Sequence, residues 1–97
     1  MDKLQETIEC IERKHKSHIE LACLSCEVYS DDAHFCIGFS LANGDCEKIT
    51  MKIIYGEDMT YDDERLIEEF NDFVDKSSEI LTTYYNIDCD ITGSYYI

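Results

Sequence analysis

Clustered carboxylates are the residues of this chain whose types and spacing could do chemistry. Between residues 57 and 79 only Arg65 and Lys76 are basic, against ten acids: Glu57, Asp58, Asp62, Asp63, Glu64, Glu68, Glu69, Asp72, Asp75 and Glu79. Carboxylates in such number can pair with arginine and lysine of another molecule, hold a cation, or serve as general acid and base. The geometry in which the chain holds them decides among these uses.

Five of the acids share one face of the helix that this segment is expected to form: Glu64, Glu68, Asp72, Asp75 and Glu79. At about 100° per residue they fall within about an 80° arc and span about 22 Å. Their repeat of about 5–6 Å is close to the phosphate spacing of a nucleic-acid strand, about 6–7 Å. Glu64–Glu68 and Glu68–Asp72 are like-charge pairs four residues apart, each unfavourable by roughly 0.2–0.5 kcal/mol. The stripe is a solvated helix face, a surrogate for nucleic-acid phosphates that binds a basic groove, or a cation site.

The long-range field supports a basic partner. The net charge is −14 on 97 residues, which repels nucleic acid and anionic membranes and attracts basic surfaces. We therefore expect a basic nucleic-acid-binding protein as partner, with no direct contact to nucleic acid or membrane. The acids at the helix entry extend the charged edge, and Tyr61 is a candidate aromatic anchor; these additional partner-binding residues are Glu57, Asp58, Tyr61, Asp62 and Asp63.

Six cysteines allow a second interpretation. Zinc could use Cys23 and Cys26 with Cys36, Cys46 or a histidine such as His34 or His18. A single CxxC in a predicted strand places its two thiols on opposite faces, however. Free buried thiols that act as small hydrophobes are the simpler expectation, and His15, His18 and His34 are expected to be surface or helix-end residues.

The sequence lacks the signatures of an enzyme. It contains no Gly-rich phosphate loop, nucleophile elbow or HExxH motif, and no EF-hand pattern of acids around a glycine. Paired carboxylates need a desolvated cleft to separate their pKa values, and a solvated stripe does not supply one. We expect no catalytic residues, no metal and no cofactor.

Composition indicates one folded domain over residues 1–97. A hydrophobic content of 44% with seven Tyr and four Phe is sufficient for a core despite the acidity. No apolar run approaches the roughly 18 residues that span a bilayer. The charged N-terminus is unlike a secretory signal, so we expect a cytoplasmic protein, in the host cytoplasm if it is phage-encoded.

The elements that must position the acids follow from periodicity. Apolar residues at helical spacing predict helices over residues 2–16 and 61–84. Alternation predicts strands over 19–29, with a turn at 30–33, and over 34–41, then a strand carrying Ile49, Met51, Ile53 and Tyr55, and a last strand over 87–97. The order is α-β-β-β-α-β, an α+β fold whose mostly antiparallel sheet carries both helices on one face.

Local signals refine three of these boundaries. A hairpin loop with an odd number of residues keeps the apolar residues of both strands on one face, which favours the three-residue loop Ala42–Gly44 with Gly44 in the left-handed region. This loop would place Ile53 and Tyr55 on the apolar face with Phe39. Thr60 is the expected N-cap of the second helix, in a capping box with Asp63. That helix is expected to bury Tyr84 and the apolar residues before it. The polar face of the last strand is a second contact surface or a solvent face: Asp88, Asp90, Thr92, Ser94 and Tyr96.

In organisation, the acidic segment 57–79 together with the hairpin resembles the small acidic inhibitors encoded by phages and mobile elements, above all the anti-CRISPR proteins that mimic DNA. The resemblance implies a stoichiometric inhibitor that occludes the basic DNA-binding groove of a host defence nuclease, such as the PAM-reading surface of a CRISPR effector. The six cysteines and the fourth strand depart from that class. The alternatives are an immunity protein or antitoxin that neutralises a basic toxin, and a small zinc-binding interaction module.

Overall fold

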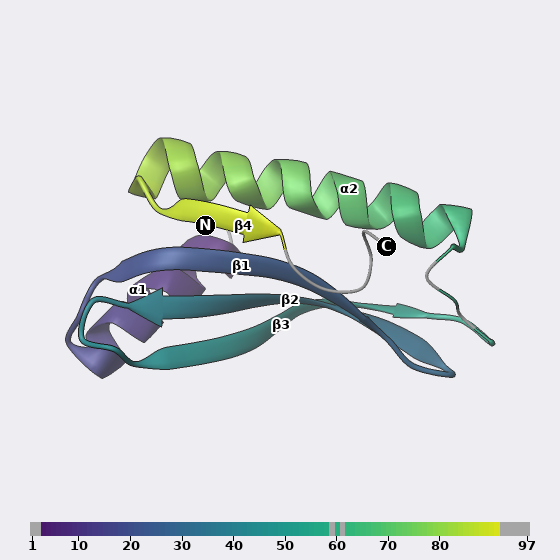
Figure 1. Ribbon diagram of the computed structural model, residues 1–97, viewed down its shortest axis with the longest axis horizontal. Helices are drawn as coiled ribbons and strands as arrows, with labels where there is room; N and C mark the ends of the chain where they lie inside the picture. The colour runs from purple at the N-terminus through teal and green to yellow at the C-terminus, as the bar shows by residue number, and fades with distance from the viewer. Residues whose placement is uncertain (1–2, 59, 61, 92–97) are drawn as a thin grey trace.

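The structure, a computed structural model, describes residues 3–58, 60 and 62–91. Within them the elements follow the predicted order (Figure 1): α1 (Lys3–His15), β1 (Ile19–Val28), β2 (Asp32–Leu41), β3 (Cys46–Tyr55), α2 (Glu64–Glu79) and β4 (Asp88–Ile91). A π-helical turn, Ile80–Tyr84, continues α2. The α+β class is as predicted.

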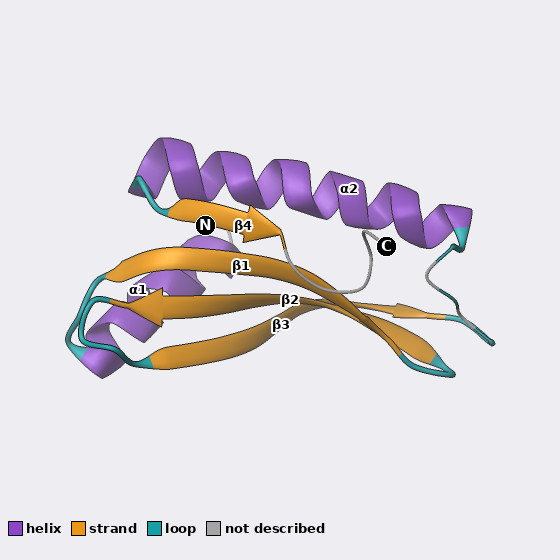
Figure 2. Cartoon of the chain, viewed as in Figure 1, coloured by secondary structure: helices purple, strands orange, loops and turns teal. Residues whose placement is uncertain are grey.

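The strands form one sheet in the order β3-β2-β1-β4 (Figure 2). β1 pairs with β2, and β2 with β3, in antiparallel fashion, whereas β4 runs parallel to β1. The prediction of a mostly antiparallel sheet is confirmed. Because β3 and β4 are the two edges, the segment that contains α2 crosses the whole sheet between them.

The core lies between one face of the sheet and both helices. α1 buries Ile8 and Ile11, and α2 buries Leu66 and Phe70. These residues belong to one cluster with alternate strand residues: Ala22, Leu24, Cys26, Ala33, Phe35, Ile37, Phe39 and Leu41. Since successive strand residues point to opposite faces, both helices cover the same face, and the other face is left open.

The β2–β3 loop has the predicted form. The Leu41 N–H donates to the Asp45 carbonyl at 2.9 Å, and the Gly44 N–H donates to the Leu41 carbonyl at 3.0 Å. These bonds enclose the loop Ala42–Gly44, and Gly44 has a φ of 94°. Glycine adopts this left-handed backbone without a steric penalty, which is why the loop forms here.

A β-bulge in β3 was not predicted. Cys36 pairs with Thr50, but the preceding β2 residue, Phe35, pairs with Lys52. Met51 is therefore an extra residue in β3. One inserted residue reverses which face every later side chain occupies.

The bulge overturns the expected placement of the end of β3. Ile54 lies on the core face and is 8% exposed, whereas Ile53 and Tyr55 are 38% and 70% exposed. The expectation that Ile53 and Tyr55 share the apolar face with Phe39 is wrong, because the alternation of side chains counted from the loop holds only up to the bulge. Two large apolar side chains are thereby placed on the open face.

The second helix begins later than predicted. The N-cap is Asp63, whose carboxylate Oδ1 accepts from the N–H groups of Arg65 at 2.9 Å and Leu66 at 3.3 Å. The expected cap, Thr60, instead donates its hydroxyl to the Asp62 carboxylate. Threonine and aspartate are both good N-caps. A turn precedes the helix, in which the Asp63 N–H donates to the Thr60 carbonyl.

The end of the helix also differs from the prediction. Tyr84 is 70% exposed rather than buried, while Leu81 is fully buried and Tyr85 packs against the core. The π-helical turn Ile80–Tyr84 adds a residue to the helical repeat, so the inward position shifts from Tyr84 to Tyr85.

The last strand is described only as far as Ile91. Asp88 and Asp90 are both exposed, so neither is part of the core. Of the polar face expected there, Thr92, Ser94 and Tyr96 lie outside the described residues.

Candidate partner-binding surface

The acidic stripe, defined as Glu64, Glu68, Asp72, Asp75 and Glu79, lies on α2 as predicted. All five residues are exposed. On the opposite side, the helix buries Leu66, Phe70 and Val74. Core packing thus fixes the rotation of α2 and turns the stripe toward solvent along the length of the helix.

Most of the stripe carries unneutralised charge. Asp72 forms an ion pair with Lys76 at 3.0 Å, on side chains that are 60% and 75% exposed. Among the residues that the structure describes, Glu64, Glu68, Asp75 and Glu79 have no ion pair. An exposed pair such as Asp72–Lys76 is weak, so a partner's cation can replace Lys76 at little cost.

The other cations near α2 are directed away from the stripe. The Arg65 guanidinium donates from Nη2 to the Tyr55 carbonyl at 2.9 Å, which ties the start of α2 to the end of β3. Lys52 of β3 lies 3.8 Å from Glu69, an acid outside the stripe. Among the described residues, Lys76 is therefore the one basic group that forms an ion pair with the stripe.

The acids at the helix entry have mixed roles. Glu57, Asp58 and Asp62 are exposed, and the Thr60 hydroxyl lowers the pKa of the Asp62 carboxyl. Asp63 caps α2 through its Oδ1 atom, which accepts from two backbone N–H groups, and its role in partner binding stays a prediction. Tyr61 lies outside the described residues.

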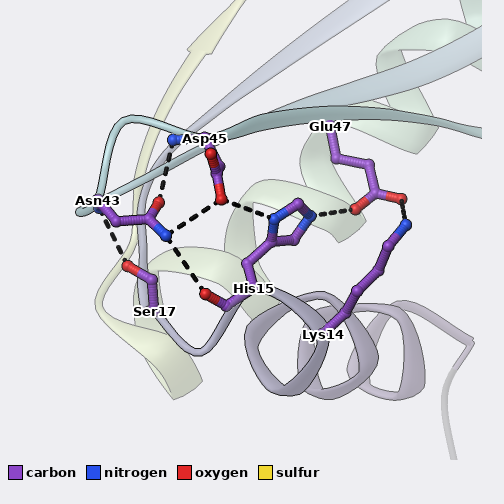
Figure 3. A network of polar contacts seen from close by, with 6 residues as sticks. All are labelled: Lys14, His15, Ser17, Asn43, Asp45 and Glu47. Carbon is purple, nitrogen blue, oxygen red and sulfur yellow. Dashed lines mark hydrogen bonds and ion pairs between the residues drawn. The ribbon is translucent and has the colours of Figure 1, made fainter.

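A polar network without a sequence signature ties the end of α1 to the β2–β3 hairpin (Figure 3). The His15 ring nitrogen Nδ1 lies 3.0 Å from Asp45 Oδ2, and Nε2 lies 2.7 Å from Glu47 Oε2. Lys14 Nζ lies 3.2 Å from the other Glu47 oxygen. The Asn43 side-chain amide donates to the His15 carbonyl at 3.2 Å and to Asp45 Oδ2 at 3.1 Å.

The two carboxylates favour the charged form of the His15 imidazole. The hydrogen bond with Glu47, followed by that with Asp45, raises the pKa of His15. The same contacts with His15 lower the pKa of Glu47 and of Asp45. In the charged form both ring nitrogens donate, one to Asp45 and the other to Glu47. The network is a clamp between two elements, and His15 is the helix-end residue expected from the sequence.

The cysteines do not form a metal site within the described residues. There, no group of three or more His, Cys, Asp or Glu is arranged to hold an ion. Cys26 faces the core and is 2% exposed, whereas Cys23 contributes to a shallow hollow on the open face with Gly38 and Lys48. The two thiols of the CxxC thus point to opposite faces, as expected.

The thiols differ in exposure. Burial raises the pKa of Cys26 to about 11 and also raises that of Cys36, so both stay protonated near neutral pH. They are free, buried thiols, as predicted for the cysteines generally. Cys10 and Cys46 are exposed, so the expectation of buried thiols is wrong for these two. Cys10 lies on the outer face of α1, and Cys46 lies at the start of the edge strand β3.

No helix in the described part of the chain is both long and apolar enough to cross a membrane. The sequence matches no protein family, and no curated protein or solved structure is detectably similar to it.

Proposed function

We propose that this chain is a stoichiometric protein inhibitor whose acidic stripe occupies the basic nucleic-acid-binding groove of another protein. The observation that carries the proposal is the exposure of all five stripe carboxylates along one side of α2, with Lys76 the one described cation paired to them. The function is binding, without a catalytic step of its own.

The spacing of the charges supports a phosphate surrogate. Successive stripe residues are three or four positions apart, which separates them by about 4.5–6 Å along the helix. This is close to the phosphate spacing of a nucleic-acid strand. Arginine and lysine side chains that hold successive phosphates would meet successive carboxylates here. Arginine can bind each carboxylate in the bidentate geometry that it also uses for phosphate.

The rigidity of the stripe supports tight capture. α2 is anchored by Leu66, Phe70 and Val74 in the core and capped by Asp63. Binding therefore orders only the outer parts of the acidic side chains rather than the backbone, which limits the entropic cost of association. The net charge of −14 accelerates encounter with a basic groove.

The target class follows from the charge and from the resemblance to DNA-mimic anti-CRISPR proteins. We propose a nucleic-acid-guided or other defence nuclease, with the groove that normally holds DNA as the contact surface. The inhibitor would act in the cytoplasm, and in the host cytoplasm if it is phage-encoded.

The proposal is tested by affinity capture from a bacterial lysate at low salt, followed by elution with duplex DNA. We expect the wild-type chain to retain a basic nucleic-acid-binding protein that DNA releases. The variant E68K/D72K/D75K should not retain it. The control E6K/E9K/E20K changes net charge equally at exposed positions away from α2 and should still retain it. Capture that survives stripe reversal, or no capture of any basic protein, would refute the proposal.

A further inference from the structure

Two exposed tyrosines flank an aspartate at one end of the open sheet face. Asp32 of β2 pairs with Tyr55 of β3, and on its other side the Tyr29 N–H donates to the Asp32 carbonyl at 2.8 Å. Tyr29 is 50% exposed and Tyr55 is 70% exposed. The three residues form a row across three chain segments, with the carboxylate between the aromatic side chains.

The neighbouring pair of residues on the open face adds an imidazole ring and an apolar side chain. His34 pairs with Ile53, its ring lies 4.9 Å from the Tyr29 ring, and its Nε2 atom lies 3.1 Å from Asp32 Oδ2. Ile53 is 38% exposed. The bulge at Met51 is what brings Ile53 and Tyr55 to this face. We call Tyr29, Asp32, His34, Ile53 and Tyr55 the tyrosine patch.

The surroundings of the patch are acidic. Asp31, at the tip of the β1–β2 turn, and Glu57 and Asp58, just after β3, are exposed. The Gly56 N–H donates to the Asp31 carbonyl at 3.1 Å, which holds these two loops together. Among the described residues none of these three acids forms an ion pair. The cations described nearby are Arg65, at the Tyr55 carbonyl, and Lys48, which pairs with Glu27. The acids outnumber them, so the local charge around the tyrosine patch is negative.

We infer that the tyrosine patch is a docking surface for an arginine-bearing segment of a partner protein. A guanidinium can lie flat on a tyrosine ring while its N–H groups reach a carboxylate. Tyr29 and Tyr55 offer the rings on either side of Asp32. The Asp32 Oδ2 atom contacts His34, which leaves Oδ1 to accept from the guanidinium, and the Asp31 carboxylate lies at the rim. Lysine cannot make the planar contact, so the surface should distinguish the two cations.

Charge argues against a second copy of this chain as the occupant. Two chains of net charge −14 that met here would bring Asp31, Glu57 and Asp58 of each copy together. Like charges in an interface oppose association. A basic segment, by contrast, neutralises the same groups.

The patch is separate from the acidic stripe. α2 covers the core face of the sheet, and the patch lies on the opposite, open face, although both begin at the end of the molecule where Arg65 contacts the Tyr55 carbonyl. The inference therefore does not depend on the stripe being a nucleic-acid surrogate. Each surface can be altered while the other is kept.

The test compares two peptides in NMR titrations of the full chain. One is a Gly/Ser-spaced peptide with three arginines, and the other has three lysines at the same positions. We expect the arginine peptide to bind about fivefold more tightly or better, from cation–π contacts with two exposed rings, with shifts centred on Tyr29 and Tyr55. The variant Y29A/Y55A should lose this preference, and Y29F/Y55F should keep it because the rings remain.

Three results would overturn the inference. The first is an equal affinity for both peptides, and the second is an arginine preference that survives in Y29A/Y55A. The third is concentration-dependent dimerisation in sedimentation that Y29A/Y55A abolishes, which would identify a second copy as the occupant. The stripe variant E68K/D72K/D75K should weaken both peptides similarly through net charge and leave their ratio unchanged, so that failure of the patch and failure of the stripe are distinguishable.

Discussion

Replacing Glu68 by lysine should stabilise the fold and weaken partner binding. Glu68 lies at the centre of the acidic stripe, four residues from Glu64 on one side and from Asp72 on the other. Both neighbours are exposed acids, so the wild-type helix carries two repulsive pairs here. A lysine at position 68 converts both into attractive pairs. Arg65 does not oppose the change, because its guanidinium is held on the Tyr55 carbonyl at 2.9 Å.

The size of the effect follows from the two pairs. Removing two repulsions of roughly 0.2–0.5 kcal/mol each and adding the attraction to Glu64, with a weaker one to Asp72, gives about 1 kcal/mol. The contribution from Asp72 is the smaller, because Asp72 already pairs with Lys76 at 3.0 Å and because the lysine would precede its acid. For a domain of this size about 1 kcal/mol raises Tm by roughly 4–8 °C. Glu68→Gln, which only removes repulsion, should give about half the gain.

Thermal unfolding followed by circular dichroism at low salt and at 1 M NaCl measures this. The gain should shrink at high salt, where the screening length falls to about 3 Å. A Glu68→Lys protein no more stable than wild type at low salt, or equally stabilised at both salt concentrations, would refute the electrostatic reasoning. A gain in stability alongside weaker capture of the partner would show that the stripe is maintained at the expense of stability.

Two further predictions concern the supports of the fold. Asp63→Ala should cost about 1 kcal/mol of unfolding free energy in urea denaturation, as expected for loss of an N-cap, while Thr60→Ala should cost little; the reverse order would place the start of α2 at Thr60. His15→Gln should destabilise the fold most near pH 5–6, because the raised pKa of His15 gives stability that is complete below the unfolded value of about 6.5 and is lost as pH rises through the folded value. In acid this stability is lost again, because Asp45 and Glu47 become protonated as the pH falls through their lowered pKa values. Equal destabilisation at pH 5.5 and pH 8.5 would contradict this mechanism.

The sequence predicts the elements whose signals are local. α1 and α2 follow from apolar residues at helical spacing, and the stripe is found because α2 is long enough for the periodicity to be unambiguous. The β2–β3 loop follows from Gly44, since its left-handed conformation is a property of one residue.

The features that the sequence does not predict depend on tertiary contacts. The bulge at Met51 has no glycine or other local marker, so simple alternation along the strand places Ile53 and Tyr55 on the wrong face. The His15 clamp joins residues 30 and 32 positions apart, which no spacing rule connects. Thr60 and Asp63 are both acceptable caps, and the path of the chain from β3 selects between them. The tyrosine patch is hidden from the sequence for the same reason as the bulge.

The most direct test of the proposed function is the affinity of the captured nuclease for three forms of the chain, in competition with labelled duplex DNA over a range of salt concentrations. The forms are wild type, E68K/D72K/D75K and E6K/E9K/E20K. Both variants change net charge from −14 to −8, because each of three substitutions adds two positive charges. We expect the stripe variant to lose at least about tenfold in affinity and to show a weaker salt dependence, while the control stays close to wild type. Equal losses for the two variants would contradict the proposal, because net charge rather than the stripe on α2 would then account for binding.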